Sequence, residues 1–457
     1  MSKLNFNEFE SVSAKKWTQK IQFDLKGLDY NKTLLTPTLE GLTIKPFYHK
    51  ETANFLDVPV SHEPFKICQT FFIDDVIITN KLANEALSKG ATALNFKADS
   101  PFELDVFFKD IPESCPIFFK LNFLSPSFNA DLIKRLQSYK CALNIDIIGH
   151  LASEGNWYKS NKDDHKHLAQ ILEKAPENIS VLNVDTTLYQ NAGANTVQQV
   201  AYALAHLNEY FNAIAEGVLP KPKSSEICVN FAIGSNYFLE IAKLRAFRHL
   251  FEVLVKEYDF NFKLVIFAKP SLRNKSIYDY NVNMLRTTTE CMSAILGGAD
   301  VISNVSYDAI FHKSNAFGER IARNQLLVLQ EESYFKLAKD GVKGTYFIET
   351  LTSQIAEKAL VLFKEIEKKK GFVNQLFAGV IQRKIIENAE KEQTQFDAGD
   401  LSFIGVNKYP NPQDKMAEDL ELYPFLKTKP HKTLIQPIVP KRLAEKLETE
   451  RIAKENV

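Results

Sequence analysis

The sequence lacks the features that identify secreted, membrane-spanning or disulfide-bonded proteins. It has only five cysteines in 457 residues, far apart and odd in number, which favours reduced thiols over a disulfide framework or a zinc site. It has no apolar run of roughly 18 or more residues, so no membrane span is predicted. The first residues, MSKLNFNEFESVSAKKW, contain no apolar segment of the kind found in a secretory signal. These absences predict a cytoplasmic protein.

Net charge and the common nucleotide and hydrolase motifs are also missing. The 56 Lys and Arg are balanced by 56 Asp and Glu, which gives no reason to expect nucleic acid or an anionic membrane as a partner. We find no GxGxxG after a strand, no P-loop, no GxSxG elbow and no HExxH. The sequence therefore indicates neither a nucleotide site nor a common hydrolase.

From about residue 90, short β-type runs alternate with amphipathic helical stretches. Mostly apolar strands between helices predict a parallel sheet covered on both faces. Seven such runs without a break in composition favour a closed (β/α)8 TIM barrel over an open sheet. For the eighth strand the sequence offers only residues 343–349 as one option. The seven runs are residues 91–96, 116–123, 141–148, 178–185, 226–233, 262–269 and 299–304.

Two different segments flank the predicted barrel domain, which spans residues 36–406. Residues 1–35 form an arm whose large apolar residues, including Phe6, Phe9 and Trp17, follow helical spacing. These apolar residues must be buried either on the surface of the chain's own barrel domain or, as we expect, on a partner chain. Residues 407–457 form a Pro- and Lys-rich tail, predicted to be extended and then to end in a short charged helix. We expect the tail to wrap the same partner.

The stretch VDTTLYQNAGA, residues 184–194, looks like a catalytic position with little catalytic chemistry. An apolar strand ends in small polar residues, followed by a glycine turn and a helix, yet Asp185 is the only ionisable group. Elsewhere, Arg320, Arg323 and Glu331 share a helix face, and we expect structural ion pairing from them. The cluster DDHKH (163–167) is expected to be a solvated helix start, because His165 and His167 point to different faces of a helix.

Several long segments resemble methylmalonyl-CoA mutases. They are TLEGLTIKPFYH (38–49), FAIGSNYFLEIAKLRAFR (231–248), RTTTECMSAILGG (286–298), RIARNQLLVLQEESYF (320–335), GVKGTYFIETLTSQIAEKA (341–359) and LSFIGVNKY (401–409). The resemblance covers roughly residues 30–410 in the family's order. It implies a (β/α)8 barrel that carries acyl-CoA, and an adenosylcobalamin-dependent exchange of methylmalonyl-CoA with succinyl-CoA.

The positions that resemble the family's substrate pocket have lost their usual residue types. The family's thioester-binding His falls on Leu188, which cannot form a hydrogen bond. Its radical-shielding Tyr falls on Val60, and an Arg near it falls on Glu63. A second His falls on Phe267 and a Gln falls on Asp300. We interpret these five positions as a vestigial pocket, partly filled by side chains, and predict no catalytic residue in the chain.

The resemblance also predicts that adenosylcobalamin is bound by another chain. In this family a flavodoxin-like domain with an Asp-x-His-x-x-Gly loop binds the cofactor. We expect no such domain in this subunit, and Asp163-x-His165 lacks the glycine because Leu168 stands there. We therefore expect a non-catalytic small (beta) subunit that scaffolds the large, catalytic subunit of a heterodimer.

Two alternatives remain open. The chain could be an active acyl-CoA mutase barrel that works with a separate cobalamin-binding protein. It could also be a repurposed barrel that binds another ligand, lined by Asp185, Tyr189, Asn191 and Asp300.

Overall fold

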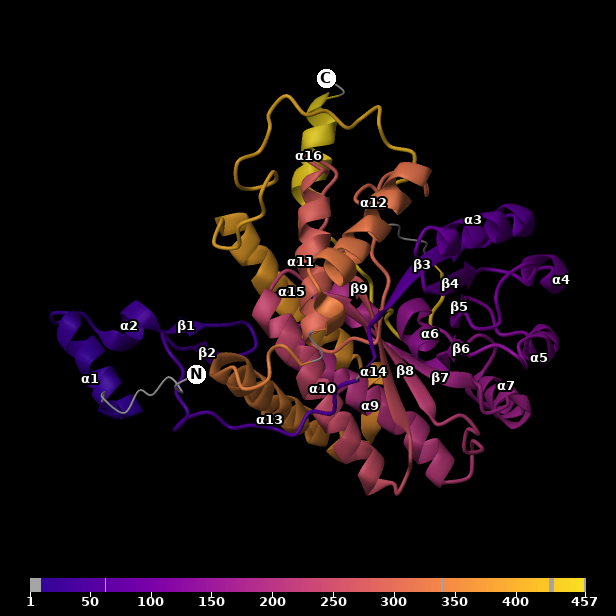
Figure 1. Ribbon diagram of the computed structural model, residues 1–457, viewed down its shortest axis with the longest axis horizontal. Coiled ribbons are helices and arrows are strands. Elements are labelled where there is room, and N and C mark those ends of the chain that lie inside the picture. The colour runs from indigo at the N-terminus through magenta and orange to yellow at the C-terminus, as the bar shows by residue number, and fades with distance from the viewer. Residues whose placement is uncertain (1–9, 62, 338–339, 427–430, 456–457) are drawn as a thin grey trace, which may run out of the picture.

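The computed structural model describes residues 10–61, 63–337, 340–426 and 431–455. Eight parallel strands close into a barrel in the order β10-β3-β4-β5-β6-β7-β8-β9, surrounded by helices (Figure 1). The predicted (β/α)8 fold is confirmed. The strands are β3 (Lys66–Phe72), β4 (Ala93–Ala98), β5 (Ile117–Leu121), β6 (Cys141–Ile145), β7 (Ile179–Asp185), β8 (Glu226–Ile233), β9 (Lys263–Pro270) and β10 (Val301–Ile302).

The eighth strand precedes the seven runs that the sequence identified. It is β3, with the sequence KICQTFF, and it pairs with both β4 and β10. Its polar residues interrupt the apolar pattern because alternate side chains face the barrel interior, which is polar near both ends. The option at residues 343–349 is wrong: it runs into the start of α13 (Tyr346–Lys368).

Helices follow the strands, as the alternation of β-type and helical stretches in the sequence predicts. After α13 the chain continues in two helices, α14 and α15, which are separated at Gly379, a residue with a left-handed φ of 68°. The helices around the barrel are α3 (Val76–Ser88), α4 (Leu104–Phe107), α5 (Pro126–Arg135), α6 (Ile147–Glu154), α7 (Asn161–Lys174), α8 (Thr187–Asn191), α9 (Thr196–Ala215), α10 (Tyr237–Glu257), α11 (Val282–Leu296), α12 (Ala316–Leu327), α14 (Gly371–Phe377) and α15 (Val380–Ala398).

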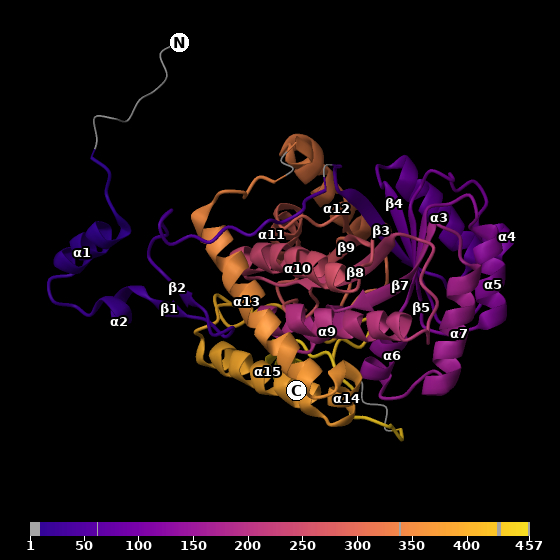
Figure 2. The ribbon, with the colours of Figure 1, turned by 90° about the horizontal axis from the view of Figure 1, so that it is seen from below.

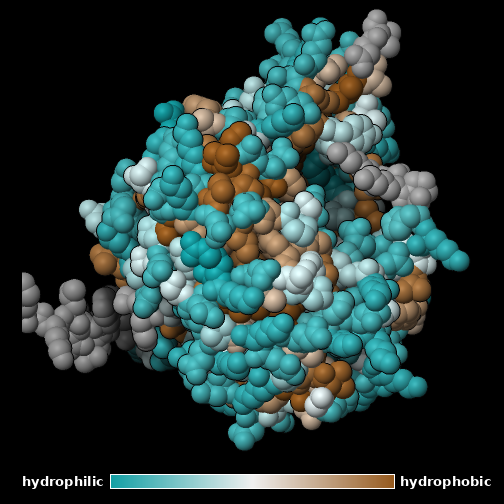
Figure 3. Space-filling model, turned by 90° about the vertical axis from the view of Figure 1, so that its right-hand side faces the viewer, coloured by the Kyte–Doolittle hydropathy of each residue, from teal (hydrophilic) through white to brown (hydrophobic). Residues whose placement is uncertain are grey.

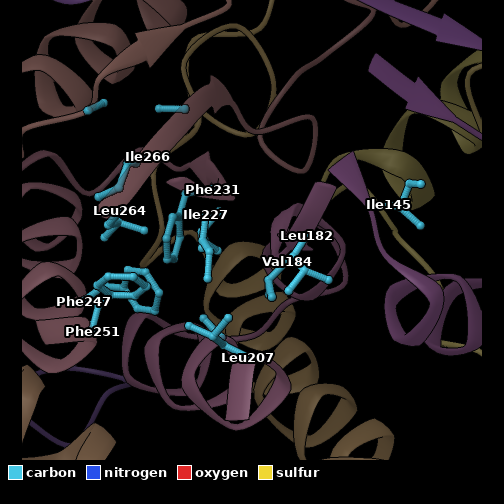
Figure 4. Close-up of a cluster of buried hydrophobic side chains, with 14 of the residues drawn as sticks. Ile145, Leu182, Val184, Leu207, Ile227, Phe231, Phe247, Phe251, Leu264 and Ile266 are labelled. Carbon is cyan, nitrogen blue, oxygen red and sulfur yellow. The ribbon is translucent and has the colours of Figure 1, made fainter. Parts of the chain in front are cut away.

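The main hydrophobic core lies between the strands and the helices. Figure 4 shows apolar side chains of β7, β8 and β9 facing those of α9 and α10. Phe231 of β8 packs edge-to-face on Phe247 of α10, with ring centroids 4.9 Å apart, and both are fully buried. Burying a large apolar side chain contributes about 1.5–3 kcal/mol, so this layer holds the barrel closed whatever its interior contains. On the face shown in Figure 3, apolar residues occur in a few small groups on a mostly hydrophilic surface.

The N-terminal arm stands away from the barrel (Figures 1 and 2). It comprises α1 (Ala14–Asp24), α2 (Tyr30–Leu34) and the short hairpin of β1 (Thr36–Pro37) and β2 (Thr43–Ile44). Neither helix has a buried residue. Trp17 touches Phe47 edge-on but stays 50% exposed, and Phe23 is 80% exposed. Phe6 and Phe9 lie outside the described residues.

The described residues of the C-terminal tail pack on the chain's own barrel, and the expectation that the tail also wraps a partner stays a prediction. The backbone N–H groups of Leu434 and Ile435 donate to the Gly155 carbonyl, and that of Ile438 donates to Ala152. Ile435 and Ile438 are buried in the main core. The final helix, α16 (Glu445–Glu455), is fixed by a buried ion pair between Arg442 and Glu448. The tail forms part of the barrel's C-terminal face, because its apolar residues Ile435 and Ile438 are buried there.

None of the described helices combines the length and the apolar character that crossing a membrane requires.

Candidate functional site

The middle of the barrel interior is closed by a layer of apolar side chains. Phe118 of β5 and Phe267 of β9 meet across the axis, with ring centroids 5.2 Å apart. Both are buried. Alternate residues of each strand point inward, so this layer separates the two ends of the barrel. It consists of Cys68, Ala93, Phe118, Ala142, Cys228, Phe267 and Val301, with Val265 packed against it.

A cavity of about 480 Å³ opens at the end of the barrel where the strands begin. Its floor includes Phe118 of the apolar layer. Arg248 and Asp300, which both line this cavity, form an ion pair. The Arg248 guanidinium donates to the Asp300 carboxylate at 2.5 Å and to the Gly298 carbonyl. The same carboxylate accepts from the Ile266 backbone N–H at 2.8 Å. This arrangement fixes the start of β10 against β9 and α10.

A second cavity, of about 530 Å³, opens where the strands end. It is lined mostly by polar groups of β5 to β8 and of the loops that follow β4 to β7, with Leu121, Leu188 and Pro440 beside them. Lys120 of β5 donates to Asp185 of β7, two strands along, at 2.6 Å. Asp185 also accepts from the backbone N–H of Thr187 at 3.1 Å, so it orients the start of α8 as well. In TIM barrels this C-terminal end is where sites are formed.

Three lysines from different strands approach Asp185 at this end. Lys97 of β4 lies beside Lys120 of β5 in register, and Lys269 of β9 lies within electrostatic range of Lys120 and Asp185. Burial, together with the neighbouring ammoniums of Lys269 and Lys120, lowers the pKa of Lys97 to about 7. Burial also lowers the pKa of Lys269. The Asp185 carboxylate raises the pKa of Lys120, so that side chain stays charged.

The pKa of Asp185 is also set by burial and by the neighbouring charged groups. Burial alone would raise its pKa, but the ammoniums of Lys120 and Lys269 hold it below its usual range. Lys97 and Lys269 form no side-chain hydrogen bond or ion pair within the described part of the chain. One carboxylate thus faces three ammoniums in the barrel interior.

A buried hydrogen-bond network supports the wall of the second cavity. The Asp146 carboxylate accepts from His206 at 2.9 Å, from Tyr210 at 2.9 Å and from the backbone N–H of Asp185 at 2.9 Å. Tyr189 bonds the other ring nitrogen of His206 at 2.8 Å. Burial would raise the pKa of Asp146, but His206 and the N–H donors hold it low. Tyr189 and His206 have no exposed surface, so they position the loop after β6, whereas Asp146 itself lines the cavity.

The five positions of the predicted vestigial pocket do not come together in one cavity. Val60, Glu63 and Asp300 line the cavity where the strands begin. Leu188 lines the cavity where the strands end, and Phe267 lies in the apolar layer between them. Glu63 is exposed and lies 3.8 Å from the Lys66 ammonium. At Phe267 a side chain fills the barrel interior, as the sequence predicts, and Phe118 packs against it there.

The alternative ligand set predicted from the sequence is only half assembled. Asp185 and Asn191 line the second cavity. Tyr189 is fully buried beneath it. Asp300 lies at the other end of the barrel, because β10 is two residues long and Asp300 precedes it. The sequence placed Asp300 at the wrong end of its strand.

Of the remaining charged residues that the sequence analysis discussed, Arg323, His165 and Asp164 form hydrogen bonds within the protein. Arg323 is buried and donates to Gln69 at 2.6 Å, whereas Arg320 and Glu331 are exposed, so only Arg323 matches the expected structural pairing, and its partner is neutral. His165 bonds the Asn161 carbonyl on α7 at 2.8 Å. Asp164, expected to be solvated, is fully buried and accepts from the backbone N–H groups that precede α7.

Sequence reasoning missed the lysines that dominate the C-terminal end. Each is the single charge near the end of an apolar strand, in NFKA (95–98), FFKL (118–121) and IFAKP (266–270). A lone Lys at that position of three strands is the signal that would have revealed them, because strand ends of a parallel barrel converge.

The described residues do not fit a cobalamin or a metal ion. No three His, Cys, Asp or Glu side chains converge in the described ranges. His165, in the fragment that partly matches the cobalamin signature, lies on the solvent side of α7 and bonds its own helix. We therefore assign no step of cobalamin chemistry to these residues.

Comparison with known proteins gives a consistent family. The methylmalonyl-CoA mutase family model matches residues 133–446. The methylmalonyl-CoA mutase small subunit of Porphyromonas gingivalis is 33% identical over 450 residues, covering 89% of this chain and 71% of that protein. The small subunit of Streptomyces virginiae is 26% identical, covering 88% and 71%. The methylmalonyl-CoA mutase of Escherichia coli is 33% identical over 236 residues, covering 50% of this chain and 33% of that protein.

Among solved structures, the dihydropteroate synthase of Thermus thermophilus aligns with 13% identity and a TM-score of 0.33, over 61% of this chain and 99% of that one. A likeness this remote adds nothing to the assignment.

The fold and the interior define a (β/α)8 barrel with two separate end cavities and a closed axis. The match over most of its length shows that the chain belongs to the methylmalonyl-CoA mutase family.

Proposed function

We propose that this chain is the non-catalytic small subunit of an adenosylcobalamin-dependent methylmalonyl-CoA mutase, which interconverts methylmalonyl-CoA and succinyl-CoA in propionate metabolism. Its role is to scaffold a large, catalytic subunit in a cytoplasmic heterodimer, and the cofactor is bound by that partner. The observation that carries the proposal is the apolar layer across the barrel axis.

The layer matters because the family's barrel carries an acyl-CoA. Coenzyme A is long, and its thioester end must reach a site far from its nucleotide end. Here Phe118 and Phe267 meet on the axis, and no residue of the described chain lines both cavities. Leu188, at the predicted thioester position, offers no hydrogen bond. A barrel closed in this way supports packing and not turnover.

The arm supplies the surface that the proposed partner would cover. Trp17, Phe23 and Leu28 are all at least half exposed, and neither arm helix buries a residue on the barrel. Large apolar side chains on an extended element are the usual anchors of a permanent interface, which typically buries 2,000 Å² or more. At about 25 cal/mol per apolar Å² such burial is a substantial driving force.

Co-expression with the large subunit tests the proposal. We expect the pair to co-purify and to convert methylmalonyl-CoA, and we expect this chain alone, supplied with adenosylcobalamin and the thioester, to show no turnover. Turnover by the isolated chain would overturn the proposal. Turnover after addition of a separate cobalamin-binding protein, without the large subunit, would establish the alternative of an active barrel.

A further inference from the structure

A further cavity, of about 480 Å³, lies between the N-terminal arm and the barrel, and it shares no lining residue with the two end cavities. The hairpin of β1 and β2 forms one wall. The loop after β8, the turn before α9 and part of α15 form the others. The Asn195 side chain donates to the Leu39 carbonyl at 3.3 Å, so the hairpin is held against the barrel at this point.

Most polar side chains of this wall are fixed by hydrogen bonds within the protein. Asn195 caps α9. Gln199 accepts from the Lys243 ammonium at 2.8 Å, and Asn388 of α15 donates to the Gly193 carbonyl at 2.7 Å. The wall is therefore a rigid frame, and a ligand that enters it meets groups that are already in position.

Two buried side chains of the lining lack such partners. Gln190 is 9% exposed, and neither end of its side-chain amide forms a hydrogen bond with a described residue. The Thr196 hydroxyl, on a residue that is 5% exposed, has no partner among the described residues either. Buried polar groups are normally hydrogen-bonded, because leaving one unpaired is costly. Both side chains therefore have bonding capacity to offer a molecule in the cavity.

The position of Gly234, in the loop after β8, shows where this capacity converges. A Cβ at Gly234 would lie 3.0 Å from Gln190 Nε2 and 3.2 Å from Glu240 Oε1. Because glycine has no Cβ, the space between that donor and that acceptor stays open. All of these residues line the cavity, and the other oxygen of Glu240 pairs with Lys243.

The charges of the lining favour an uncharged ligand. Arg273 is paired with Glu392 at 2.7 Å, and Glu240 is paired as well. Glu40 and Asp400 also line the cavity and form no ion pair within the described chain, so the balance is negative. This balance repels anions. Carboxylates are, however, good acceptors for sugar hydroxyls, as in the contact of an Asp or Glu with a ribose hydroxyl in dinucleotide sites.

We propose that this cavity binds a small uncharged molecule with a vicinal diol, either a free sugar or the ribose of a nucleoside. A hydroxyl both donates and accepts, so one hydroxyl can bond the Gln190 amide while its neighbour bonds the Thr196 hydroxyl or a carboxylate of the lining. The site requires only the described chain, so its failure would leave the proposed scaffold role standing.

Calorimetric titration of the full chain with D-ribose, adenosine and ribose 5-phosphate tests the site. We expect saturable binding of ribose or adenosine, and the tighter of the two distinguishes a free sugar from a nucleoside. Ribose 5-phosphate should bind more weakly than ribose, because its phosphate meets the negative lining. No saturable binding of ribose or adenosine would show that the cavity holds only solvent and would overturn the proposal. Tighter binding of ribose 5-phosphate would contradict the uncharged ligand.

Two variants test the residues that carry the proposal. Gln190→Leu removes the amide, and Gly234→Ala fills the open space beside it. Each should weaken binding by roughly tenfold or more. Gln354→Leu is the matched control, because the Gln354 amide oxygen is also buried and unpartnered but the residue is on α13 and does not line the cavity. Equal losses in Gln190→Leu and the control would refute the site.

A second measurement separates lost binding from lost folding. The ligand should raise the melting temperature of the unaltered protein, whereas Gln190→Leu should still melt cooperatively but show no rise. In the unaltered protein, hydrogen exchange should slow at the backbone amides of residues 36–44, which form one wall of the cavity, and stay unchanged in α5. Exchange in residues 36–44 that does not respond to a bound ligand would place the binding elsewhere and refute this site.

Discussion

The two ends of the barrel hold cavities of similar volume, about 480 and 530 Å³, but they treat charge differently. Where the strands begin, the Arg248 guanidinium is matched by the Asp300 carboxylate, and Lys140 is matched by Glu226 at 2.7 Å. Where the strands end, Lys97 and Lys269 have no partner in the described chain. Paired charges at the first end fix the packing of strands and helices. Unpaired charges at the second end are in the place where this fold forms sites.

The comparison also separates the barrel's shell from its interior. The core between strands and helices is continuous and apolar, and it does not depend on which residues face the axis. Residues that face the axis can therefore change while the fold persists. Three predictions test the contrast between the two ends, and a fourth tests the arm.

The largest effect is expected from Arg248→Met. The substitution leaves the Asp300 carboxylate and the Gly298 carbonyl without their buried donor, and it should lower the free energy of unfolding by about 3–5 kcal/mol. Urea denaturation of both proteins measures the difference. Arg320→Met, on an exposed side chain, is the control and should change stability by about 0.5 kcal/mol at most. A loss as small as the control's would show that charge pairing does not stabilise the first end.

A smaller loss, roughly 1–2 kcal/mol, is expected from Lys120→Met, because the Lys120 side chain is 42% exposed and water screens its pair with Asp185. The pKa of Asp185 is lower in the folded state than in the unfolded state. The pair therefore stabilises the fold above the unfolded-state pKa of Asp185, and this stabilisation is lost as the pH falls through the folded-state pKa. The difference between the two proteins should therefore be full at pH 7 and shrink below about pH 4. Denaturation at pH 7 and pH 3 measures it, and an equal difference at both would contradict the pairing.

Lys97→Met should act in the opposite direction. The folded pKa of Lys97, about 7, is below its ordinary value, so the unfolded chain binds more protons between pH 7 and about 10. Wild-type stability should rise with pH in that window, and Lys97→Met should lack that rise. Below pH 7 the variant should be more stable by about 1–2 kcal/mol. Thermal melts at pH 6 and pH 9 test this, with Lys263→Met as the variant that keeps the wild-type slope.

The smallest effect on stability is expected at the arm. Trp17→Ala should leave the free energy of unfolding within about 0.5 kcal/mol of wild type, because the side chain is half exposed. It should nevertheless weaken capture of the proposed large subunit in a pull-down. Phe377→Ala, also 50% exposed but on α14, serves as the control. Equal capture by Trp17→Ala and wild type would remove Trp17 from the proposed interface.

Much of the barrel could be predicted from the sequence because its signal is local. Apolar runs and helical spacing placed seven strands and the helices between them, and long motifs indicated the family. The strand β3 was not predicted, because Lys66 and Thr70, which face the barrel interior, interrupt its apolar run. The packing of the tail on the chain's own barrel was not predicted, because proline spacing indicates an extended chain but not the surface that receives it.

The candidate site was harder to predict because its residues come from different strands. Leu188, Val60 and Asp300 looked like parts of one pocket in the sequence, yet the closed barrel puts the first at one end and the other two at the opposite end. The lysines that do converge are 23 residues apart in the closest case, Lys97 and Lys120. Only the register of neighbouring strands brings them side by side.

The sequence by itself determined the order of strands and helices, the apolar shell and the family, because each depends on periodicity or motifs within short segments. The tertiary structure decided which end of the barrel each side chain faces, that Phe118 and Phe267 close the axis, and that Lys97 and Lys269 remain unpaired. These properties arise when β10 pairs with β3 and closes the sheet, since closure sets the inward-facing neighbours of every strand.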